Sequence, residues 1–421
     1  MDIKITPGPL KGTVPAHASK SELHRMLICS AFSDSAVVIR GCEEDMADDI
    51  LATVTCLREL GAEISCCGDT VTVVPVRTAA QEPVLECGES GSTLRFMIPV
   101  AAAACSAAKF RGRDSLLSRP IADLISALER CGAYFSADSL PLIQKKRLAD
   151  SRFCVPGNIS SQYVSGLLMA GALMPDGATV KVTSRLGSYG YVRMTMDIMK
   201  RFGASAEESE GTFTVRGPYR SPGSETVGGD WSGAAALLAA AAAYKGSDVT
   251  VTGLDSVTFQ ADRGITDILS MLGAGTEVTG TSARVTGADK LRSIDLDIDM
   301  IPDLFPVVTA LCAGSSERSV FRNCSRLRYK ESDRIKSIGQ LIGSLGAEVS
   351  VCGDIFEVRG SAVRNSGNAD AVRDHRVVMA AAVAAYSLGI EMVIRSAECI
   401  NKSYPSFFDD LRKLGGIVDV V

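Results

Sequence analysis

Apolar and polar positions along the chain follow one pattern that recurs about every seventy residues. In each copy, a helix-like apolar stretch ends in Gly-Ala or Gly-Gly, and a strand-like run of alternating residues follows. The glycines are 71, 71, 70, 73 and 69 residues apart, at Gly61, Gly132, Gly203, Gly273, Gly346 and Gly415. Glycine is favoured just past a helix end because it adopts the left-handed conformation without strain. The spacing predicts six copies of one structural unit.

A second landmark keeps the same period, because a polar cluster precedes an apolar helix in each copy. The clusters lie at Ser19–Ser21, Glu89–Ser92, Ser160–Gln162, Asp230–Ser232, Pro302–Asp303 and Asp374–Arg376. Ser and Asp accept hydrogen bonds from the free N–H groups of a first helical turn, and Pro suits that turn. Short alternating runs such as 70–75, 212–216 and 355–359 are typical of strands. Each copy is therefore predicted to be a βαβαββ unit in which the polar cluster precedes an apolar helix.

Composition narrows the class of protein. The 421 residues suffice for two domains, and 46% hydrophobic with 22% charged residues is typical of a soluble globular chain. The most apolar runs, 234–244 and 377–386, are far shorter than the roughly 20 residues of a spanning helix, so no membrane insertion is expected. A net charge of −5 argues against a general nucleic-acid binder. The thirteen cysteines are scattered through apolar stretches and the first residues lack a signal peptide, so a reduced, cytoplasmic protein is expected.

Cationic residues gather at the predicted helix starts. Helix N-termini attract anions, but each contributes only about 0.3–1 kcal/mol near the surface, so tight anion binding needs side-chain cations as well. Those cations lie around Lys20 and Arg25, at Arg119, and within 328–334, 374–376 and 401–403. Any one cluster, taken alone, fits a helix cap or a solvated ion pair better than a site. Their recurrence at one period favours a shared site for an anionic substrate.

The order and spacing of these motifs resemble the enolpyruvyl transferase family, and within it the members that act on shikimate 3-phosphate. The resemblance covers essentially the whole chain, and Ser-Ser-Gln at 160–162 and Lys-Glu-Ser-Asp-Arg at 330–334 are its most specific motifs. It implies a two-domain, inside-out α/β barrel of six βαβαββ repeats, three per domain around pseudo-threefold axes. The implied domains are 1–17 with 229–421, and 18–228, with the active site in the cleft between them.

The activity implied by the resemblance is transfer of the enolpyruvyl group of phosphoenolpyruvate to the 5-hydroxyl of shikimate 3-phosphate, by addition and elimination with release of phosphate. The partners are then these two small molecules, in aromatic amino-acid biosynthesis, and the family is the target of glyphosate. The resemblance implies no cofactor, and no spacing typical of metal ligands occurs in the sequence. A monomer is expected.

Carried over by motif, the resemblance assigns one group of residues to shikimate 3-phosphate. Ser21 and Arg25 correspond to ligands of its carboxylate, and Gln162 and Tyr191 to residues that line its ring. Its 3-phosphate is assigned to Ser160, Ser161 and Ser188. A second group is assigned to phosphoenolpyruvate: Lys20, Gly91, Arg119, Gln162, Arg334, Arg376 and Lys402.

The chemistry calls for a base near the 5-hydroxyl and a proton donor near C3 of phosphoenolpyruvate. Asp303 is the candidate base, and Lys330 is expected close to the same hydroxyls. Glu331 and Lys20 are candidates for proton transfer at C3, and the division of roles among these residues stays open. Lys20, Asp303 and Lys330 are also expected to contact shikimate 3-phosphate.

Three positions depart from the family pattern, at Glu89, Arg326 and His17-Ala18, and they affect expected affinities rather than the reaction. Two other functions remain open. One is enolpyruvyl transfer to UDP-N-acetylglucosamine by the sister enzymes, some of which carry a loop cysteine where this chain has Asp114. The other is a non-catalytic anion-binding repeat protein, which would gain nothing from buried carboxylates such as Asp303 and Glu331.

Overall fold

The computed structural model describes residues 1–361, 365 and 367–421, and divides the chain into two compact units. Residues 18–228 form the inserted unit, and residues 1–17 with 229–421 form the discontinuous unit. The chain passes from one to the other after His17 and again after Gly228.

The inserted unit contains three four-stranded sheets, with strand orders β14-β3-β5-β4, β6-β7-β9-β8 and β10-β11-β13-β12. Its strands are β3 (Val37–Arg40), β4 (Glu63–Cys67), β5 (Thr70–Val74), β6 (Val84–Glu86), β7 (Ala108–Arg111), β8 (Tyr134–Phe135), β9 (Leu142–Lys146), β10 (Arg152–Val155), β11 (Ala178–Val182), β12 (Ser205–Ser209), β13 (Thr212–Arg216) and β14 (Ser224–Thr226). Its helices are α1 (Lys20–Ala31), α2 (Asp48–Glu59), α3 (Gly91–Ala104), α4 (Ala122–Arg130), α5 (Ser161–Gly171) and α6 (Tyr189–Arg201), with a 3₁₀ turn η1 (Asp114–Ser118).

The discontinuous unit contains three more sheets, with orders β2-β15-β17-β16, β18-β19-β21-β20 and β22-β23-β1-β24. Its strands are β1 (Ile3–Thr6), β2 (Lys11–Pro15), β15 (Asp248–Thr252), β16 (Gly275–Val278), β17 (Ser282–Thr286), β18 (Asp295–Asp297), β19 (Ser319–Arg322), β20 (Glu348–Cys352), β21 (Ile355–Arg359), β22 (Gly367–Asp370), β23 (Met392–Arg395) and β24 (Ile417–Val420). Its helices are α7 (Trp231–Ala243), α8 (Ile265–Met271), α9 (Phe305–Cys312), α10 (Arg334–Ser344), α11 (His375–Leu388) and α12 (Phe407–Lys413), with η2 (Ala261–Gly264), η3 (Ser325–Tyr329) and η4 (Ala397–Lys402).

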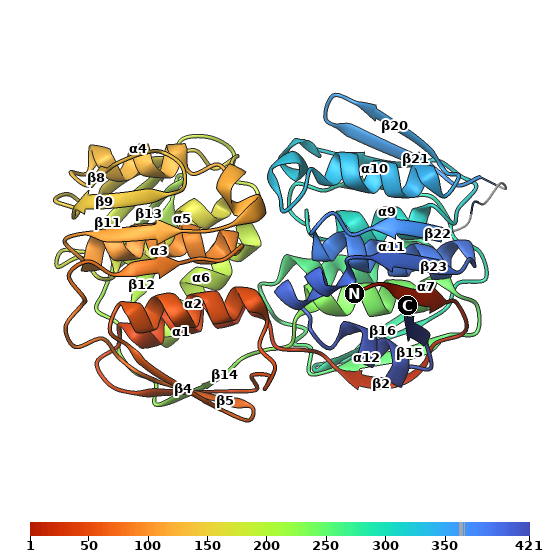
Figure 1. Cartoon of the computed structure of the whole chain (residues 1–421), viewed down its shortest axis with the longest axis horizontal. Helices are drawn as coiled ribbons and strands as arrows, with labels where there is room; N and C mark the ends of the chain where they lie inside the picture. Colours follow the sequence, from red (N-terminus) through yellow and green to blue (C-terminus); the bar gives the residue numbers. More distant parts are fainter. Residues whose placement is uncertain (362–364, 366) are drawn as a thin grey trace. The chain divides into compact units, whose positions relative to one another are not determined.

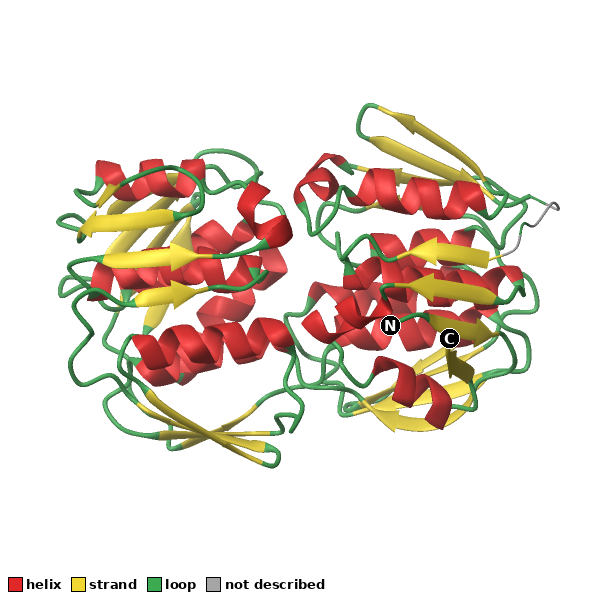
Figure 2. Cartoon of the chain, viewed as in Figure 1, coloured by secondary structure: helices red, strands yellow, loops and turns green. Residues whose placement is uncertain are grey.

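Each of these six described sheets has the same pairing: the first two strands in the order given are parallel, and the next two pairs are antiparallel. The sheets are separate and open rather than strands of one closed barrel. Strands distant in sequence complete three of them, since β14 pairs with β3, β2 pairs with β15, and β1 lies between β23 and β24. The prediction of a mixed α/β fold is confirmed (Figures 1 and 2).

The first long helix of each repeat lies in the core. In the discontinuous unit, α7, α9 and α11 pack against one another, while α7 also packs on β15 and β17, and α11 on β22 and β23. A helix covered on several sides must be apolar all round, and α9 and α11 are buried along their full length. In the inserted unit, α3 packs against α5, which in turn covers β11 and β13.

Local signals in the sequence fixed most helix ends as predicted. The six periodic glycines all have positive φ, between 76° and 108°. Each is the residue after the C-cap of a helix, in the order α2, α4, α6, α8, α10 and α12. Ser19, Ser90, Ser160, Asp230 and Asp374 each accept a hydrogen bond from a backbone N–H of the helix that follows.

The cluster at Pro302–Asp303 precedes an apolar helix, as predicted, but it does not cap that helix. Helix α9 begins at Phe305, with Leu304 at its N-cap and no side-chain cap. Pro306 lies in the first turn and supplies the fixed φ that suits a helix start. The carboxylate of Asp303 is therefore not used as a cap and instead contacts cations, as described below.

The periodic glycines yield a test of backbone strain. A Cβ at Gly415 meets no atom within 4 Å, but its φ is +87°, so Gly415→Ala should lower the free energy of unfolding by about 1 kcal/mol through strain alone. The matched control is Gly343→Ala in α10, where the Cβ also meets nothing and the backbone is helical. There alanine should raise the free energy of unfolding by roughly 0.5–1 kcal/mol. Chemical denaturation of both variants measures the two signs, and equal signs would contradict the assignment.

Candidate active site

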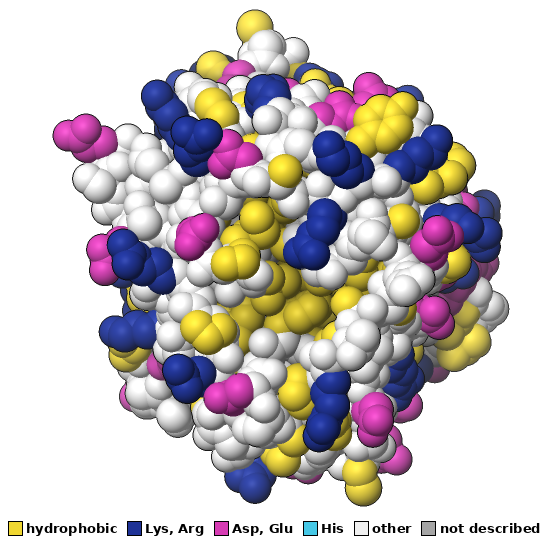
Figure 3. Space-filling view, turned by 90° about the vertical axis from the view of Figure 1, so that its left-hand side faces the viewer, with side chains coloured by type: hydrophobic (Ala, Val, Ile, Leu, Met, Phe, Trp, Pro, Cys, Tyr) yellow, Lys and Arg dark blue, Asp and Glu magenta, His cyan; other side chains and the backbone are white. Residues whose placement is uncertain are grey.

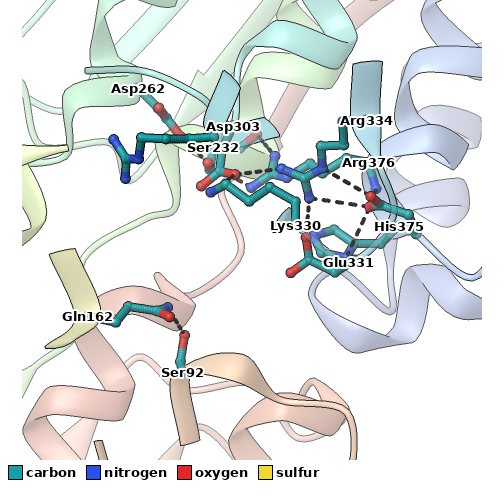
Figure 4. A network of polar contacts seen from close by, with 12 residues as sticks. Ser92, Gln162, Ser232, Asp262, Asp303, Lys330, Glu331, Arg334, His375 and Arg376 are labelled. Atoms are coloured by element: carbon teal, nitrogen blue, oxygen red, sulfur yellow. Dashed lines mark hydrogen bonds and ion pairs between the residues drawn. The ribbon is translucent and has the colours of Figure 1, made fainter. Parts of the chain in front are cut away.

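The buried guanidinium of Arg334 is the centre of the polar cluster in the discontinuous unit. Arg334 opens α10 and is 1% exposed. Its Nη1 donates to Asp303 Oδ1 at 2.7 Å and its Nη2 to Glu331 Oε2 at 2.6 Å (Figure 4). Its Nε donates to Asp374 Oδ2 at 3.0 Å. Burial alone disfavours the charge, but the three carboxylates outweigh it and raise the pKa of Arg334. The side chain is thus a fixed cation.

Asp374 connects this cluster to helix α11. Its Oδ1 accepts the backbone N–H of Arg376 at 2.9 Å as the helix cap, while its Oδ2 accepts from Ser332 Oγ at 2.9 Å as well as from Arg334. One fully buried carboxylate therefore orients both the guanidinium of Arg334 and the first turn of α11.

Lys330 and Asp303 form the second ion pair of the cluster, with Nζ and Oδ1 separated by 3.1 Å (Figure 4). Burial raises the pKa of Asp303, but Lys330, Arg334 and Arg376 more than compensate and hold that pKa well below its ordinary value. Burial lowers the pKa of Lys330, which Asp303 only partly offsets. Asp303 is thus ionised across the physiological pH range, and its basicity depends on how closely the cations approach.

Arg376 is oriented by the first turn of α7. Its Nη1 donates to the carbonyl of Ser232 at 2.8 Å and its Nη2 to Ser232 Oγ at 2.7 Å. That hydroxyl in turn donates to Asp262, on η2, in a short hydrogen bond (Figure 4). The pKa of Asp262 is raised to about 6, first by burial and then by the like charge of Asp303. A chain of three side chains from three elements therefore fixes the Arg376 guanidinium.

The remaining predicted residue of this unit, Lys402, lies on η4 and is buried. Its Nζ donates to the carbonyl of Arg373 at 2.7 Å, just before α11. Arg326, one of the positions that depart from the family pattern, forms an ion pair with Asp299 at 3.0 Å. The ring of His17, another such position, stacks on Tyr404 with centroids 3.8 Å apart.

In the inserted unit, α1 presents the predicted Lys20, Ser21 and Arg25. Lys20 Nζ donates to Asp49 Oδ2 of α2 at 2.7 Å. Arg25 is 3% exposed, and its donors reach Thr195 Oγ1 at 2.6 Å, the Ser21 carbonyl at 2.6 Å and the Tyr191 carbonyl at 3.2 Å. Burial lowers the pKa of Arg25 to about 10, so it keeps its charge at neutral pH.

Gln162 is held at both ends of its amide. Its Nε2 donates to Ser92 Oγ at 2.8 Å (Figure 4). Its Oε1 accepts from Arg95 Nη1 at 2.9 Å. Arg95 also donates to the Pro120 carbonyl at 3.1 Å, so residues of α3 set the orientation of this side chain of α5. The amide has one defined rotamer as a result.

Gly91 and Arg119 are in direct contact. A Cβ placed on Gly91 would lie 2.9 Å from Arg119 Nη1, closer than real Cβ contacts allow. The guanidinium therefore lies over the first residue of α3, where a side chain at residue 91 would displace it.

The three predicted phosphate-binding serines lie at helix starts. Ser160 caps α5, accepting from Gln162 N at 3.3 Å, and Ser161 is the first residue of that helix. Ser188 precedes α6 with φ 53° and ψ 43°, a left-handed conformation that is strained for serine. Such strain is found preferentially at functional sites. Tyr191 follows in the first turn of α6.

Four charged residues that these contacts bring into the candidate site were not predicted as site residues. They are Asp49, Arg95, Asp262 and Asp374. Asp374 stood in a predicted polar cluster, and Arg95 lies just after the cluster at Glu89–Ser92, so both could have been found from the sequence. Asp49 and Asp262 carry no local signal because their partners lie at least 29 residues away.

The described residues contain no group of three or more His, Cys, Asp or Glu side chains placed to hold a metal ion, and no helix long and apolar enough to cross a membrane. On the face drawn in Figure 3, Lys and Arg side chains are interspersed with Asp and Glu.

Comparison with known proteins agrees with this arrangement of fold and residues. Residues 5–411 match the family model described as EPSP synthase (3-phosphoshikimate 1-carboxyvinyltransferase). A 3-phosphoshikimate 1-carboxyvinyltransferase of Clostridium kluyveri is 34% identical over 99% of this chain and 98% of its own, and one of Clostridium novyi is 32% identical with the same coverage. The structure of an EPSP synthase from Acinetobacter baumannii aligns with this chain over the full length of both, with a TM-score of 0.80 at 22% identity. This likeness shows the fold.

The protein is therefore an enzyme of the enolpyruvyl transferase class. Within that class, the chain belongs to the EPSP synthase family, and the family predicted from the sequence motifs is confirmed.

The raised pKa of Asp262 predicts a pH-dependent stability. The folded state binds this proton more tightly than the unfolded chain, whose carboxyl pKa is near 3.8, so the stabilisation is complete below pH ~4 and is lost as pH rises to about 6. Asp262→Asn should unfold at about the same denaturant concentration as the parent protein at pH 4. Above pH 6 it should be more stable, by up to about 3 kcal/mol. Denaturant titrations from pH 4 to 8 measure this. Asp267→Asn, exposed on α8, controls for removal of a charge, and a constant difference across the range would contradict the assignment.

The cysteines yield a prediction about chemistry. Burial raises the pKa of Cys324 to about 12. The pKa of Cys87 is held well above its ordinary value, first by a hydrogen bond to Cys56 and second by burial. Neither thiol supplies a nucleophilic thiolate at neutral pH. Cys324→Ala and Cys87→Ala should cost about 1 kcal/mol of stability and keep turnover within a few-fold. A thousand-fold loss of turnover in folded protein would assign a thiol to the mechanism.

Proposed function

We propose that the chain transfers the enolpyruvyl group of phosphoenolpyruvate to the 5-hydroxyl of shikimate 3-phosphate and releases inorganic phosphate. The family match over residues 5–411 supports this reaction. The observation that carries it within the molecule is the cluster of Asp303, Lys330, Glu331 and Arg334, in which each carboxylate lies within 3.1 Å of a cationic side chain. A site built only to bind anions gains nothing from these carboxylates.

The reaction needs three proton transfers. In the addition, the 5-oxygen bonds to C2 of phosphoenolpyruvate and loses its proton, while C3 gains a proton. In the elimination, the bond from C2 to the phosphate oxygen breaks, C3 loses a proton, and the double bond returns. Asp303 is proposed as the base at the 5-hydroxyl, and Glu331 with Lys20 as the groups that move the proton at C3.

The ion pairs of Asp303 explain how a carboxylate with a low pKa can act as a base. Lys330 and Arg334 suppress its basicity. Anionic groups of the substrates bring negative charge to the same cations, so their hold on Asp303 weakens and its pKa rises. Lys330 is then proposed to contact the hydroxyls of shikimate 3-phosphate together with Asp303.

The binding roles follow the chemistry of each group. For shikimate 3-phosphate, we propose Ser21 and Arg25 at the carboxylate, Gln162 and Tyr191 at the ring, and Ser160, Ser161 and Ser188 at the 3-phosphate, with Lys20 nearby. Helix starts with free N–H groups suit phosphate. For phosphoenolpyruvate, we propose Lys20, Gly91, Arg119, Gln162, Arg334, Arg376 and Lys402. Arginine suits bidentate contact with carboxylate and phosphate, and lysine acts as a point charge.

The finer architecture is proposed on the same basis. The two compact units are taken as the two domains, each an inside-out α/β barrel of three βαβαββ repeats around a pseudo-threefold axis. The shared strand order of the three sheets in each unit supports this. A cytoplasmic monomer that needs no metal or cofactor is proposed as well; the thirteen free thiols fit a reducing compartment. Glyphosate should compete with phosphoenolpyruvate.

The competing function is enolpyruvyl transfer to UDP-N-acetylglucosamine. Phosphate release from phosphoenolpyruvate, measured with each acceptor in turn, separates the two. We expect release with shikimate 3-phosphate and none above background with the nucleotide sugar. The opposite result would overturn the proposed function, and release with neither would favour a non-catalytic anion-binding protein.

Asp303→Asn tests the base. The amide keeps the volume and an oxygen for Lys330 and Arg334 but cannot take the hydroxyl proton, so kcat should fall by about 10²–10⁴. Calorimetry should show shikimate 3-phosphate binding within a few-fold of the parent protein. Asp267→Asn, exposed on α8, is the control and should keep full activity. Turnover within a few-fold of the parent protein would exclude Asp303 as the base.

A further inference from the structure

A buried line of polar side chains connects the first three helices of the inserted unit. His24 Nδ1 lies 2.7 Å from Thr53 Oγ1, and Thr53 Oγ1 lies 2.7 Å from Thr93 Oγ1. Both threonines are fully buried, and His24 is 1% exposed. Thr93 Oγ1 can donate its proton to Ser90 Oγ, at 2.8 Å, or to the Asp49 carbonyl, at 3.2 Å. Burying a polar group costs folding free energy unless it is hydrogen-bonded, and the two threonine hydroxyls of this line are.

The hydrogen bonds of the line run in one direction. Because the Thr93 hydroxyl donates toward Ser90 or Asp49, it accepts from Thr53, and the Thr53 hydroxyl therefore accepts from His24. The proton of the imidazole is thus on Nδ1. The other nitrogen, Nε2, is buried with no hydrogen-bond partner, where a bare acceptor is easier to tolerate than a bare N–H. Burial and the nearby Lys20 and Arg25 lower the pKa of His24, so the ring is neutral.

This line lies beside residues of the proposed phosphoenolpyruvate site. Lys20 and His24 are one turn apart on α1, and Asp49 and Thr53 are one turn apart on α2. The two helices therefore face each other through two polar contacts, Lys20 with Asp49 at 2.7 Å and His24 with Thr53. The line ends on the backbone of that same Asp49 and on Ser90, the cap of α3 just before Gly91.

We propose that His24, Thr53 and Thr93 are positioning residues that set the Lys20–Asp49 pair and the first turn of α3 for phosphoenolpyruvate. They touch no reacting atom. An apolar contact between α1, α2 and α3 would let the helices slide, whereas hydrogen bonds of 2.7–2.8 Å fix their register at the end that carries Lys20 and Gly91. This role rests on the proposed function, since it assigns these three side chains to one of its two substrates.

The first experiment removes one hydroxyl at nearly constant volume. Thr53→Val breaks the line in the middle, and Thr53→Ser keeps the hydroxyl. Thr53→Val should raise the KM for phosphoenolpyruvate about tenfold, the effect of one buried hydrogen bond lost, while the KM for shikimate 3-phosphate changes less than twofold. Thr53→Ser should restore both. Ser30→Ala, which removes a buried hydroxyl of α1 that has no hydrogen-bond partner, is the matched control and should behave as the parent protein.

The second experiment does not depend on activity. The rate at which an acylating reagent modifies Lys20, followed by peptide mass spectrometry, should rise several-fold in Thr53→Val and not in Thr53→Ser or Ser30→Ala. If the parent protein transfers no enolpyruvyl group, the proposed function fails, while a faster modification of Lys20 still supports the positioning of Lys20 by this line. If Thr53→Val does not fold, two variants of His24 take its place. His24→Asn places an amide N–H near the Nδ1 position and should keep the KM for phosphoenolpyruvate and the modification rate of Lys20 near those of the parent protein. His24→Leu should raise both.

Two results would overturn the proposal. One is a Thr53→Val protein, folded by circular dichroism, with Lys20 modified at the parent rate and both KM values unchanged. The other is an equal change of both KM values that Thr53→Ser does not reverse, because a general loss of packing would then explain it.

Discussion

A full positive charge on Arg334 is tolerated at 1% exposure only because three carboxylates surround it. Removing one partner of a buried ion pair strongly destabilises the folded state, because the other charge is left buried and uncompensated. The loop before α10, the start of α11 and the turn before α9 supply these carboxylates, so the position of each depends on the others. The polar side of the discontinuous unit is in this sense organised by one guanidinium.

The same physical rule produces a different arrangement in the inserted unit. Arg25 is buried there as well, but neutral oxygens of Thr195, Ser21 and Tyr191 accept its donors. A guanidinium without a carboxylate partner keeps its electrostatic attraction for an anionic ligand. Arg334, by contrast, is already neutralised by Asp303, Glu331 and Asp374, which accept its hydrogen bonds. The proposed division between substrate binding and proton transfer follows this difference in partners.

Helix starts are the common structural device of both units. Five of the predicted caps accept backbone N–H groups as expected, which leaves neighbouring side chains such as Lys20, Gln162 and Arg376 in the first turn. The sixth, at Asp303, does not cap a helix because α9 begins two residues later. That single departure frees the carboxylate that the proposed chemistry uses, and it illustrates why a repeated motif can carry different roles in different copies.

The sequence by itself determined the features that depend on neighbours along the chain. These are the positive-φ glycines, the helix caps, the alternating strands, and the motifs that indicated the family. The tertiary structure decided which groups meet across long separations, such as Asp262 with Ser232, Thr53 with His24, and β14 with β3. Periodicity predicts the face of a helix or strand on which a residue lies. The partner of a buried polar side chain depends instead on how separate elements pack, and this packing leaves no pattern in the local sequence.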